Sequence, residues 1–223
     1  MVGIFICFIL RRDIIHISEG VLSAPVLAAG IAAGAAGTAV GLKKLKEDQI
    51  PQVAIVTAAL FIASLIHLPL GPSSVHLLLN GIAGILLGWK VFPAMLVALL
   101  LQAILFQHGG LTVLGVNLVN VALPAVLAGY LFNLIFARVK ANKKICGILA
   151  VFCAALAVLL TVLLVVLSLV LSDAGAFTEM SGVIFVSHIP VIIIEGILSG
   201  IMVVFMLKVK PSIFRGQELS PIN

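Results

Sequence analysis

Charge is what this sequence has least of. Only 9% of its 223 residues are Asp, Glu, Lys or Arg, whereas a soluble domain carries about a quarter. Hydrophobic residues make up 63%, and the mean hydropathy is +1.35. Several apolar runs approach or exceed the roughly 20 residues that cross a bilayer as a helix, and the ~10-residue alternating segments of a membrane β-barrel do not occur. These features predict an all-α fold, a polytopic membrane helix bundle embedded in the lipid bilayer.

Motifs of nucleotide binding and catalysis are also missing. There is no G-x-x-x-x-G-K-[ST], so the chain does not bind ATP through a P-loop. The absence of H-E-x-x-H and G-x-S-x-G speaks against an intramembrane protease or esterase. The three cysteines, Cys7, Cys146 and Cys153, lack the spacing of a metal or redox site, and we expect the last two to be packing residues. We therefore expect a protein that is not an enzyme and has no catalytic cofactor.

Seven apolar segments divide the chain, which predicts about seven transmembrane helices. They run roughly over 24–42, 51–68, 75–89, 91–107, 113–137, 145–171 and 183–207. The third and fourth are short, and Lys90 and Pro93 separate them, which predicts a tight hairpin of two short helices, with one bent helix as the alternative. The first segment carries glycines at a spacing that lets helices approach closely, either inside the bundle or against a partner subunit. These are Gly30, Gly34, Gly37 and Gly41.

The basic residues orient the chain. Eleven of the thirteen Lys and Arg follow odd-numbered segments, whereas the loops at 69–74, 107–112 and 172–182 carry none. Because positive loops stay in the cytoplasm, this pattern predicts an N-out, C-in protein of the cytoplasmic (inner) membrane. The net charge of +5 then reflects cytoplasmic loops, and we expect no nucleic-acid partner.

Residues 1–14 fit neither a span nor a signal peptide. Their apolar stretch is about ten residues long, and Arg11 and Arg12 follow it instead of preceding it. We interpret 1–14 as an unusual leader or a mis-assigned start. Residues 15–210 are then a single membrane domain, and 211–223 are a cytoplasmic tail.

Polar side chains inside a membrane domain are costly, so each suggests a function. All five histidines map near the predicted outward ends of segments or to outward loops, and histidine is the commonest ligand for transition metals. We expect His67 and His188 to cap helix ends at the interface. Glu195 falls in mid-membrane and needs a partner or a water cavity. Its role in packing, coupling or metal passage is open at this point.

Four local motifs occur in a specific order. They are H-I-S-E-G-V-L at 16–22, G-P-S-S-V-H at 71–76, Q-H-G-G-L-T-V-L-G-V-N at 107–117 and I-P-V-I-I-I-E-G at 189–196. Together they resemble the CbiM/NikM family, the substrate-binding membrane subunits of cobalt and nickel energy-coupling-factor transporters. The resemblance covers residues 15 to about 207. It implies a subunit that binds Co(II) or Ni(II) as the transported ligand, without choosing between them. It also implies a membrane coupling subunit, cytoplasmic ATPases and, in some systems, a small accessory membrane protein as partners.

The same resemblance implies a set of metal ligands. Members of the family bind the metal through their terminal amine, the backbone nitrogen and imidazole of the second residue, and a later imidazole. Here these would be Ile15 (the backbone amine, if it is the mature N-terminus), His16 and His76. Position 15 is Ile instead of Met, so the resemblance further implies a non-AUG start at codon 15 or removal of the leader there. Adjacent chelate rings and a fourth nitrogen form a planar set, which suits Ni(II) or Cu(II), with Co(II) close in preference.

Four further residues are candidates for supporting this site. Ser74, His108 and Asn117 could orient the ligands, and His108 could equally touch the metal. Glu19 could attract cations or anchor the N-terminal segment.

Two other function classes stand beside this one. A gradient-driven secondary transporter of a divalent cation should have ionisable residues near the midplane and often inverted repeats. Only Glu195 meets the first condition, and no internal repeat is found. An intramembrane metalloenzyme should have a nucleophile or general base set, and none is recognisable.

Overall fold

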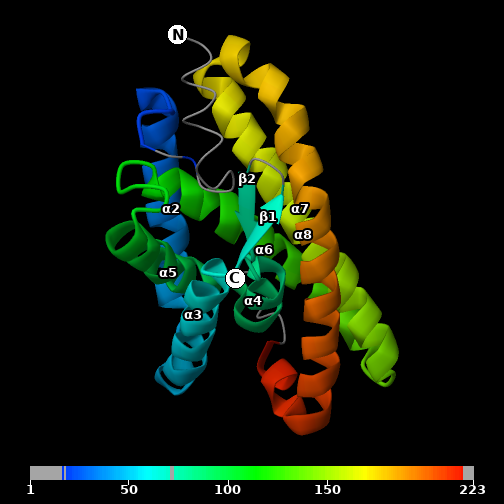
Figure 1. The fold of residues 1–223 in the computed structure, drawn as a ribbon. Coiled ribbons are helices and arrows are strands. Elements are labelled where there is room, and N and C mark those ends of the chain that lie inside the picture. Colours follow the sequence, from blue (N-terminus) through cyan, green and yellow to red (C-terminus); the bar gives the residue numbers. More distant parts are fainter. Residues whose placement is uncertain (1–16, 18, 71–72, 218–223) are drawn as a thin grey trace.

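The computed structural model describes residues 17, 19–70 and 73–217, with the backbone alone at 67–70, 73–75, 174–180 and 215–217 (Figure 1). Each predicted apolar segment overlaps one helix, so the membrane helix bundle is confirmed in outline. The elements are α2 (Ala24–Lys43), α3 (Ile50–Ser64), β1 (His67–Leu70), β2 (Ser73–His76), α4 (Asn80–Leu87), α5 (Val91–Phe106), α6 (Leu114–Val139), α7 (Lys143–Ser172) and α8 (Ala174–Val209). Three short 3-10 helices complete it, η1 (Glu47–Gln49), η2 (Gly88–Lys90) and η3 (Pro211–Gln217).

Five stretches of the described chain are long and apolar enough to cross a bilayer. They are α2, the run Asn80–Phe106 that joins α4 to α5, α6, α7 and Ser181–Val209 of α8. By contrast α3 has 15 residues and α4 has eight. At the rise of an α-helix they extend roughly 22 and 12 Å, less than the ~30 Å hydrocarbon core. Seven full spans are therefore not confirmed, and the N-out, C-in orientation stays a prediction.

The α-helix is interrupted between α4 and α5. Gly88, the first residue of η2, has a φ of +55° there. Up to this point α4 runs in the same direction as α6. Asn80 at its start donates to the carbonyl of Val121 at 3.3 Å, and Gly84, one turn later, lies against Ala125. The two helices are therefore parallel where they pack together.

Helix α5 leads back the other way. Its first turn lies beside the C-terminal end of α2, where Gly41 packs against Pro93. The start of α6 lies beside the N-terminal half of α2, where Gly30 packs against Val116. Since residues 107–113 join α5 to α6, α5 must run from the C-terminal end of α2 towards its N-terminal half. The third and fourth predicted segments are therefore separate helices joined through η2, and because Asn80–Phe106 together has the length of one span, the hairpin of two spans stays a prediction.

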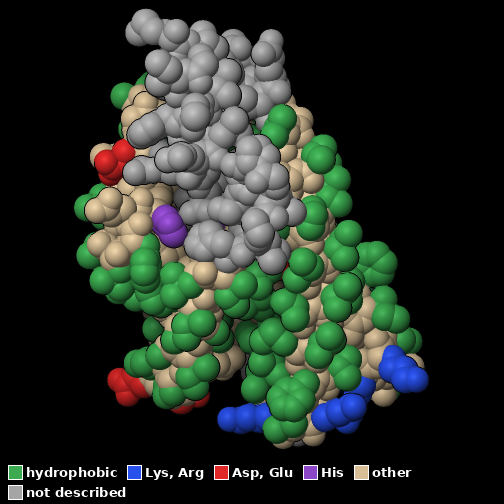
Figure 2. Space-filling view, viewed as in Figure 1, with side chains coloured by type: hydrophobic (Ala, Val, Ile, Leu, Met, Phe, Trp, Pro, Cys, Tyr) green, Lys and Arg blue, Asp and Glu red, His purple; other side chains and the backbone are tan. Residues whose placement is uncertain are grey.

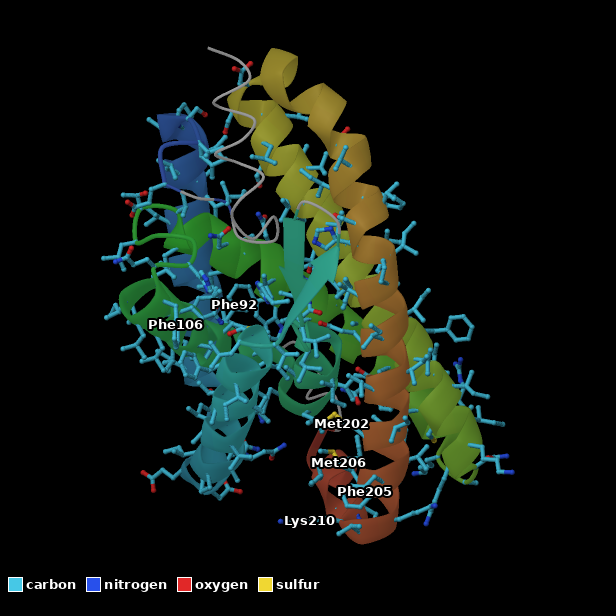
Figure 3. The ribbon with its side chains drawn as sticks, viewed as in Figure 1. Phe92, Phe106, Met202, Phe205, Met206 and Lys210 are labelled. Atoms are coloured by element: carbon cyan, nitrogen blue, oxygen red, sulfur yellow. The ribbon has the colours of Figure 1, made fainter. Side chains whose placement is uncertain are left out.

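The glycines of α2 pack inside the bundle. Gly30 and Gly34 approach α6, whereas Gly37 and Gly41 approach the start of α5, and all four are buried. A side chain at Gly37 would collide with the ring of Phe92, which Figure 3 labels. Close internal packing, one of the two roles considered for this spacing, is the one that the structure shows.

Two segment boundaries differ from the sequence prediction. A β-hairpin of β1 and β2, with His67 opposite His76, replaces the end of the second predicted segment and the start of the third. Pro69 has no N–H to donate along a helix, which accounts for the interruption. The predicted loop at 172–182 was wrong, because α8 begins at Ala174 directly after Asp173. Glycine and serine suggested a loop there, but the same stretch holds Ala, Glu and Met, which favour a helix.

Lys and Arg gather at the end of the bundle where α7 begins and α8 ends, away from the α7–α8 junction (Figures 1 and 2). This one-sided distribution is what the orientation argument requires. The described part of the predicted tail folds back at the same end. Phe214 of η3 is 6% exposed, with its ring 5.6 Å from that of Phe136 and 6.2 Å from that of Phe132 in α6. Met202 and Met206 lie on the side of α8 that faces η3 (Figure 3).

Candidate metal site

The N-terminal segment is clamped directly after His16. Ile15 and His16 themselves lie outside the described residues, but Ile17 is described and is 4% exposed. The N–H of Ile17 donates to Asn117 Oδ1 at 3.2 Å, and its carbonyl accepts from Asn117 Nδ2 at 3.1 Å. A primary amide carries an acceptor and a donor side by side, so one side chain binds both backbone groups of one residue. Asn117 thereby holds the chain immediately beside the predicted ligand His16.

Glu19 fastens the same segment to the loop before α6. Its Oε1 accepts the N–H of Leu111 at 2.9 Å and that of Thr112 at 3.3 Å. The side chain also lies against Gly110, whose φ of +151° and close approach leave no room for a Cβ. Of the two roles considered for Glu19, the structure shows anchorage of the N-terminal segment.

His76, the second predicted imidazole ligand, ends β2 and is 1% exposed. It lines a cavity of ≈ 10 Å³, enough for about one water molecule. Residues of α3, α5 and α6 complete the lining, among them Leu60, Ser64, Met95, Gln102 and Val121.

The ring of His76 lies beside a backbone carbonyl. Its Nδ1 is 3.2 Å from the carbonyl oxygen of Leu77. A carbonyl oxygen can only accept, so a hydrogen bond between the two requires the proton on Nδ1. In the neutral ring Nε2 would then carry the lone pair with which an imidazole binds a metal.

Helix α6 connects the two halves of the site. Asn117, which holds Ile17, and Val121, which lines the His76 cavity, are one turn apart and therefore share a face of the helix. Ile17, which Asn117 holds, directly follows the predicted ligand His16 in the sequence.

The remaining predicted site residues have simpler surroundings. His108 is half-buried, and its ring centroid is 6.2 Å from that of Phe106. Its backbone N–H donates to the backbone carbonyl of Gln102 at 3.3 Å. Ser74 pairs with Pro69 across the hairpin, two residues before His76. Its side chain is not among those described, so its role stays a prediction.

His188 does not lie where the sequence suggested. It was expected to cap a helix end, but it lies within α8 and is 2% exposed. Its Nδ1 lies 2.5 Å from the carbonyl oxygen of Ile184, one turn earlier, and 3.3 Å from Ser187 Oγ. The prediction was wrong because α8 starts nearer the N-terminus than its apolar run suggests, which puts position 188 inside the helix.

Glu195 has the partner that its mid-membrane position demanded. It lies at the middle of the span Ser181–Val209 and is 0% exposed. Its Oε1 accepts the backbone N–H groups of Leu78 and Leu79, the second at 2.9 Å. These two residues follow His76 almost directly. No role could be assigned to Glu195 from the sequence, and its link to the backbone after His76 is seen only in the structure.

No three His, Cys, Asp or Glu side chains come together to form a complete metal site within residues 17, 19–70 and 73–217. Cys146 and Cys153 are buried and free, as expected of packing residues.

Comparison with known proteins identifies the family. Residues 16–213 match the model of the CbiM family, described as the cobalt uptake substrate-specific transmembrane region. A putative metal transport protein of Haemophilus influenzae is 42% identical over 91% of this chain and 98% of its own length. A putative fused cobalt transport protein CbiMQ of Methanocorpusculum labreanum is 30% identical over 89% of this chain, which corresponds to 36% of the fused protein.

The fold comparison agrees with this result. The crystal structure of a truncated transition metal transporter superposes with a TM-score of 0.70, covering 88% of this chain and 98% of that one at 24% identity. Relatives of this kind are metal transport proteins and not enzymes, and their helical membrane architecture is shared by this chain. The chain belongs to the CbiM family of multi-pass membrane proteins for cobalt uptake.

Proposed function

We propose that this protein captures Co(II) or Ni(II) at an outward-facing site of nitrogen ligands and mediates its uptake across the cytoplasmic membrane. Position 15 would supply a terminal amine, His16 a backbone nitrogen and an imidazole, and His76 its Nε2. The amine, the amide and the imidazole of His16 close two adjacent chelate rings, and His76 completes a planar set of four nitrogens.

The observation that carries this proposal is the clamp on Ile17. Asn117 binds both backbone groups of Ile17, one helical turn before Val121, which lines the His76 cavity. The backbone directly after His16 is thereby held on the helix that also lines this cavity, which lowers the conformational freedom that a metal would otherwise have to restrict. Glu19 reinforces the clamp from the following turn.

The chelate requires a free amine, so we propose that the functional chain begins at position 15. Intact mass spectrometry of the natively expressed protein tests this step. A mature chain that retains Met1 and still binds metal tightly would contradict it.

We further propose that the protein is the substrate-specific subunit of an ATP-driven energy-coupling-factor transporter. The sequence has no P-loop, so any ATP must be hydrolysed by another chain. The relative named CbiMQ is a fusion, in which a region similar to this chain forms part of a longer transport protein. A membrane coupling subunit and cytoplasmic ATPase subunits are therefore the expected partners, together with a small accessory membrane protein in some systems.

Equilibrium binding of Co(II) and Ni(II) to purified variants tests the site. His16→Ala should abolish detectable binding, because it removes the imidazole that closes the second chelate ring. His76→Ala should weaken binding strongly, because it removes one of the four nitrogen ligands. His67→Ala is the matched control, since His67 occupies the opposite strand of the same hairpin. It should bind nearly as the parent does, and so should His188→Ala, whose ring bonds within α8.

Two results would overturn the assignment. Full affinity in His16→Ala, together with loss in His67→Ala or His188→Ala, would place the site elsewhere. Metal uptake that persists in cells lacking the ATPase subunits and stops with a protonophore would instead favour a gradient-driven secondary transporter.

A further inference from the structure

Glu195 and His76 lie on either side of one peptide group. The peptide unit between Leu77 and Leu78 has its N–H on Leu78 and its C=O on Leu77. The N–H donates to Glu195 Oε1, and the carbonyl oxygen lies 3.2 Å from His76 Nδ1. One rigid plane therefore connects a carboxyl group of α8 to the ring of the predicted metal ligand.

We propose that Glu195 is a positioning residue for the metal site and sets the tautomer and orientation of His76 through this peptide group. The inference rests on the proposed function, in which His76 Nε2 binds Co(II) or Ni(II). Glu195 fixes the direction of the peptide plane, the Leu77 carbonyl then holds the proton on Nδ1, and Nε2 faces the metal with its lone pair. A carbonyl or carboxylate that receives the second N–H of a ligating histidine commonly serves this purpose.

The local backbone shows that Glu195 holds the loop in an otherwise unfavourable shape. Leu79 has a φ of +48°, in the left-handed region that leucine rarely adopts. Its N–H also donates to Glu195 Oε1, at 2.9 Å. The turn aims two consecutive N–H groups at one oxygen, and Asn80 begins α4 immediately afterwards. Glu195 thus stabilises the conformation that carries the chain from β2 into α4.

Burial strengthens the two hydrogen bonds that this peptide group makes. Glu195 and His76 are 0% and 1% exposed, so water does not readily replace either hydrogen bond. Bonds in series through a peptide group polarise one another, which makes the Leu77 carbonyl a better acceptor when the Leu78 N–H is bound. Without the carboxyl group, the peptide plane is free to turn and the His76 ring loses its fixed orientation.

The test measures Co(II) and Ni(II) affinity of the full chain in detergent for Glu195→Ala and Glu195→Gln. Loss of a group that orients a metal ligand typically costs about 10- to 100-fold in affinity. We expect a loss of about that size for Glu195→Ala. Glu195→Gln should retain most of the affinity, because the amide oxygen still accepts both N–H groups. Ser199→Ala is the matched control, since Ser199 is also buried, lies one turn later on α8 and has no hydrogen-bond partner for its hydroxyl.

A double-mutant cycle separates positioning from general destabilisation. If Glu195 acts through His76, Glu195→Ala should cause no further loss of affinity in a His76→Ala background. Additive losses in the double variant would overturn the proposal, and so would equal losses in Glu195→Gln and Glu195→Ala. If Glu195→Ala does not fold, the comparison of Glu195→Gln with Ser199→Ala decides: a loss of tenfold or more in the glutamine variant alone refutes the acceptor role.

The outcome is distinguishable from failure of the proposed function. A parent protein that binds neither Co(II) nor Ni(II) would refute the metal site itself. A parent that binds metal, with unchanged affinity in Glu195→Ala, would refute only the positioning role.

Discussion

Replacing Asn117 by alanine should release the N-terminal segment from α6. The substitution leaves the helix intact, since alanine is the best helix former. It removes the acceptor for the Ile17 N–H and the donor for the Ile17 carbonyl at once. Ile17 is 4% exposed and Asn117 is 3% exposed, so both backbone groups of Ile17 would lose their hydrogen-bond partner at a site that water reaches only in part.

The structure allows the size of the effect to be worked out. Leaving a buried backbone group without a partner costs about 1–3 kcal/mol, so two groups that water reaches in part cost about 2–4 kcal/mol together. Because 1.4 kcal/mol corresponds to a factor of ten, the ratio of docked to undocked segment should fall roughly 30- to 700-fold. The apparent Kd for metal rises only as the inverse of the docked fraction. For a parent segment that is docked about 99% of the time, Kd would rise at most about eightfold.

Hydrogen exchange is therefore the more sensitive assay. The amides of Leu111 and Thr112 donate to Glu19 and should lose protection when the segment detaches. Asn120→Ala is the matched control. Asn120 is equally buried on the same helix, but its side chain accepts from Ser168 Oγ at 3.3 Å, whereas Asn117 binds Ile17. Unchanged protection in Asn117→Ala, or an equal loss in Asn120→Ala, would refute the reasoning.

Three further predictions concern packing, topology and pH. Gly84→Ala should destabilise the protein by about 1–3 kcal/mol, seen as a lower Tm in detergent, because its Cβ would meet the carbonyl of Ala125. Gly182→Ala, with open space around the new methyl group, should not lower Tm. In a background without the three native cysteines, a cysteine at Thr112 should react with an impermeant thiol reagent in intact cells, and one at Ala141 should not; the reverse pattern would invert the orientation. Metal affinity should fall as the pH is lowered, because protons compete with the metal for the imidazole nitrogens, and an affinity that does not change with pH would contradict histidine ligands.

Much of the architecture could be predicted because its cause is local. Apolar runs predicted the approximate position of each α-helix in the described chain, since only hydrogen-bonded helices satisfy the backbone within lipid. The distribution of Lys and Arg predicted which ends of the helices share one side, and the Lys and Arg in view in Figure 2 lie at the end of the bundle where α7 begins and α8 ends. Family motifs directed attention to His76 and Asn117. Where local signals conflicted, the prediction failed: the loop expected at 172–182 is helical, and a hairpin at 67–76 interrupts two expected helices.

The pairings that build the candidate site depend on contacts distant in sequence, which no single-chain pattern reveals. Residues 17 and 117 are a hundred positions apart, yet one amide side chain joins them. Glu195 was recognisable as a costly buried acid, but only folding shows that it binds the peptide group after His76. The sequence by itself determined a metal-transport membrane bundle, because hydropathy and motifs are properties of short stretches. Which side chains hold Ile17 and the backbone after His76 was decided by the tertiary structure, because the packing of helices and loops sets those distances.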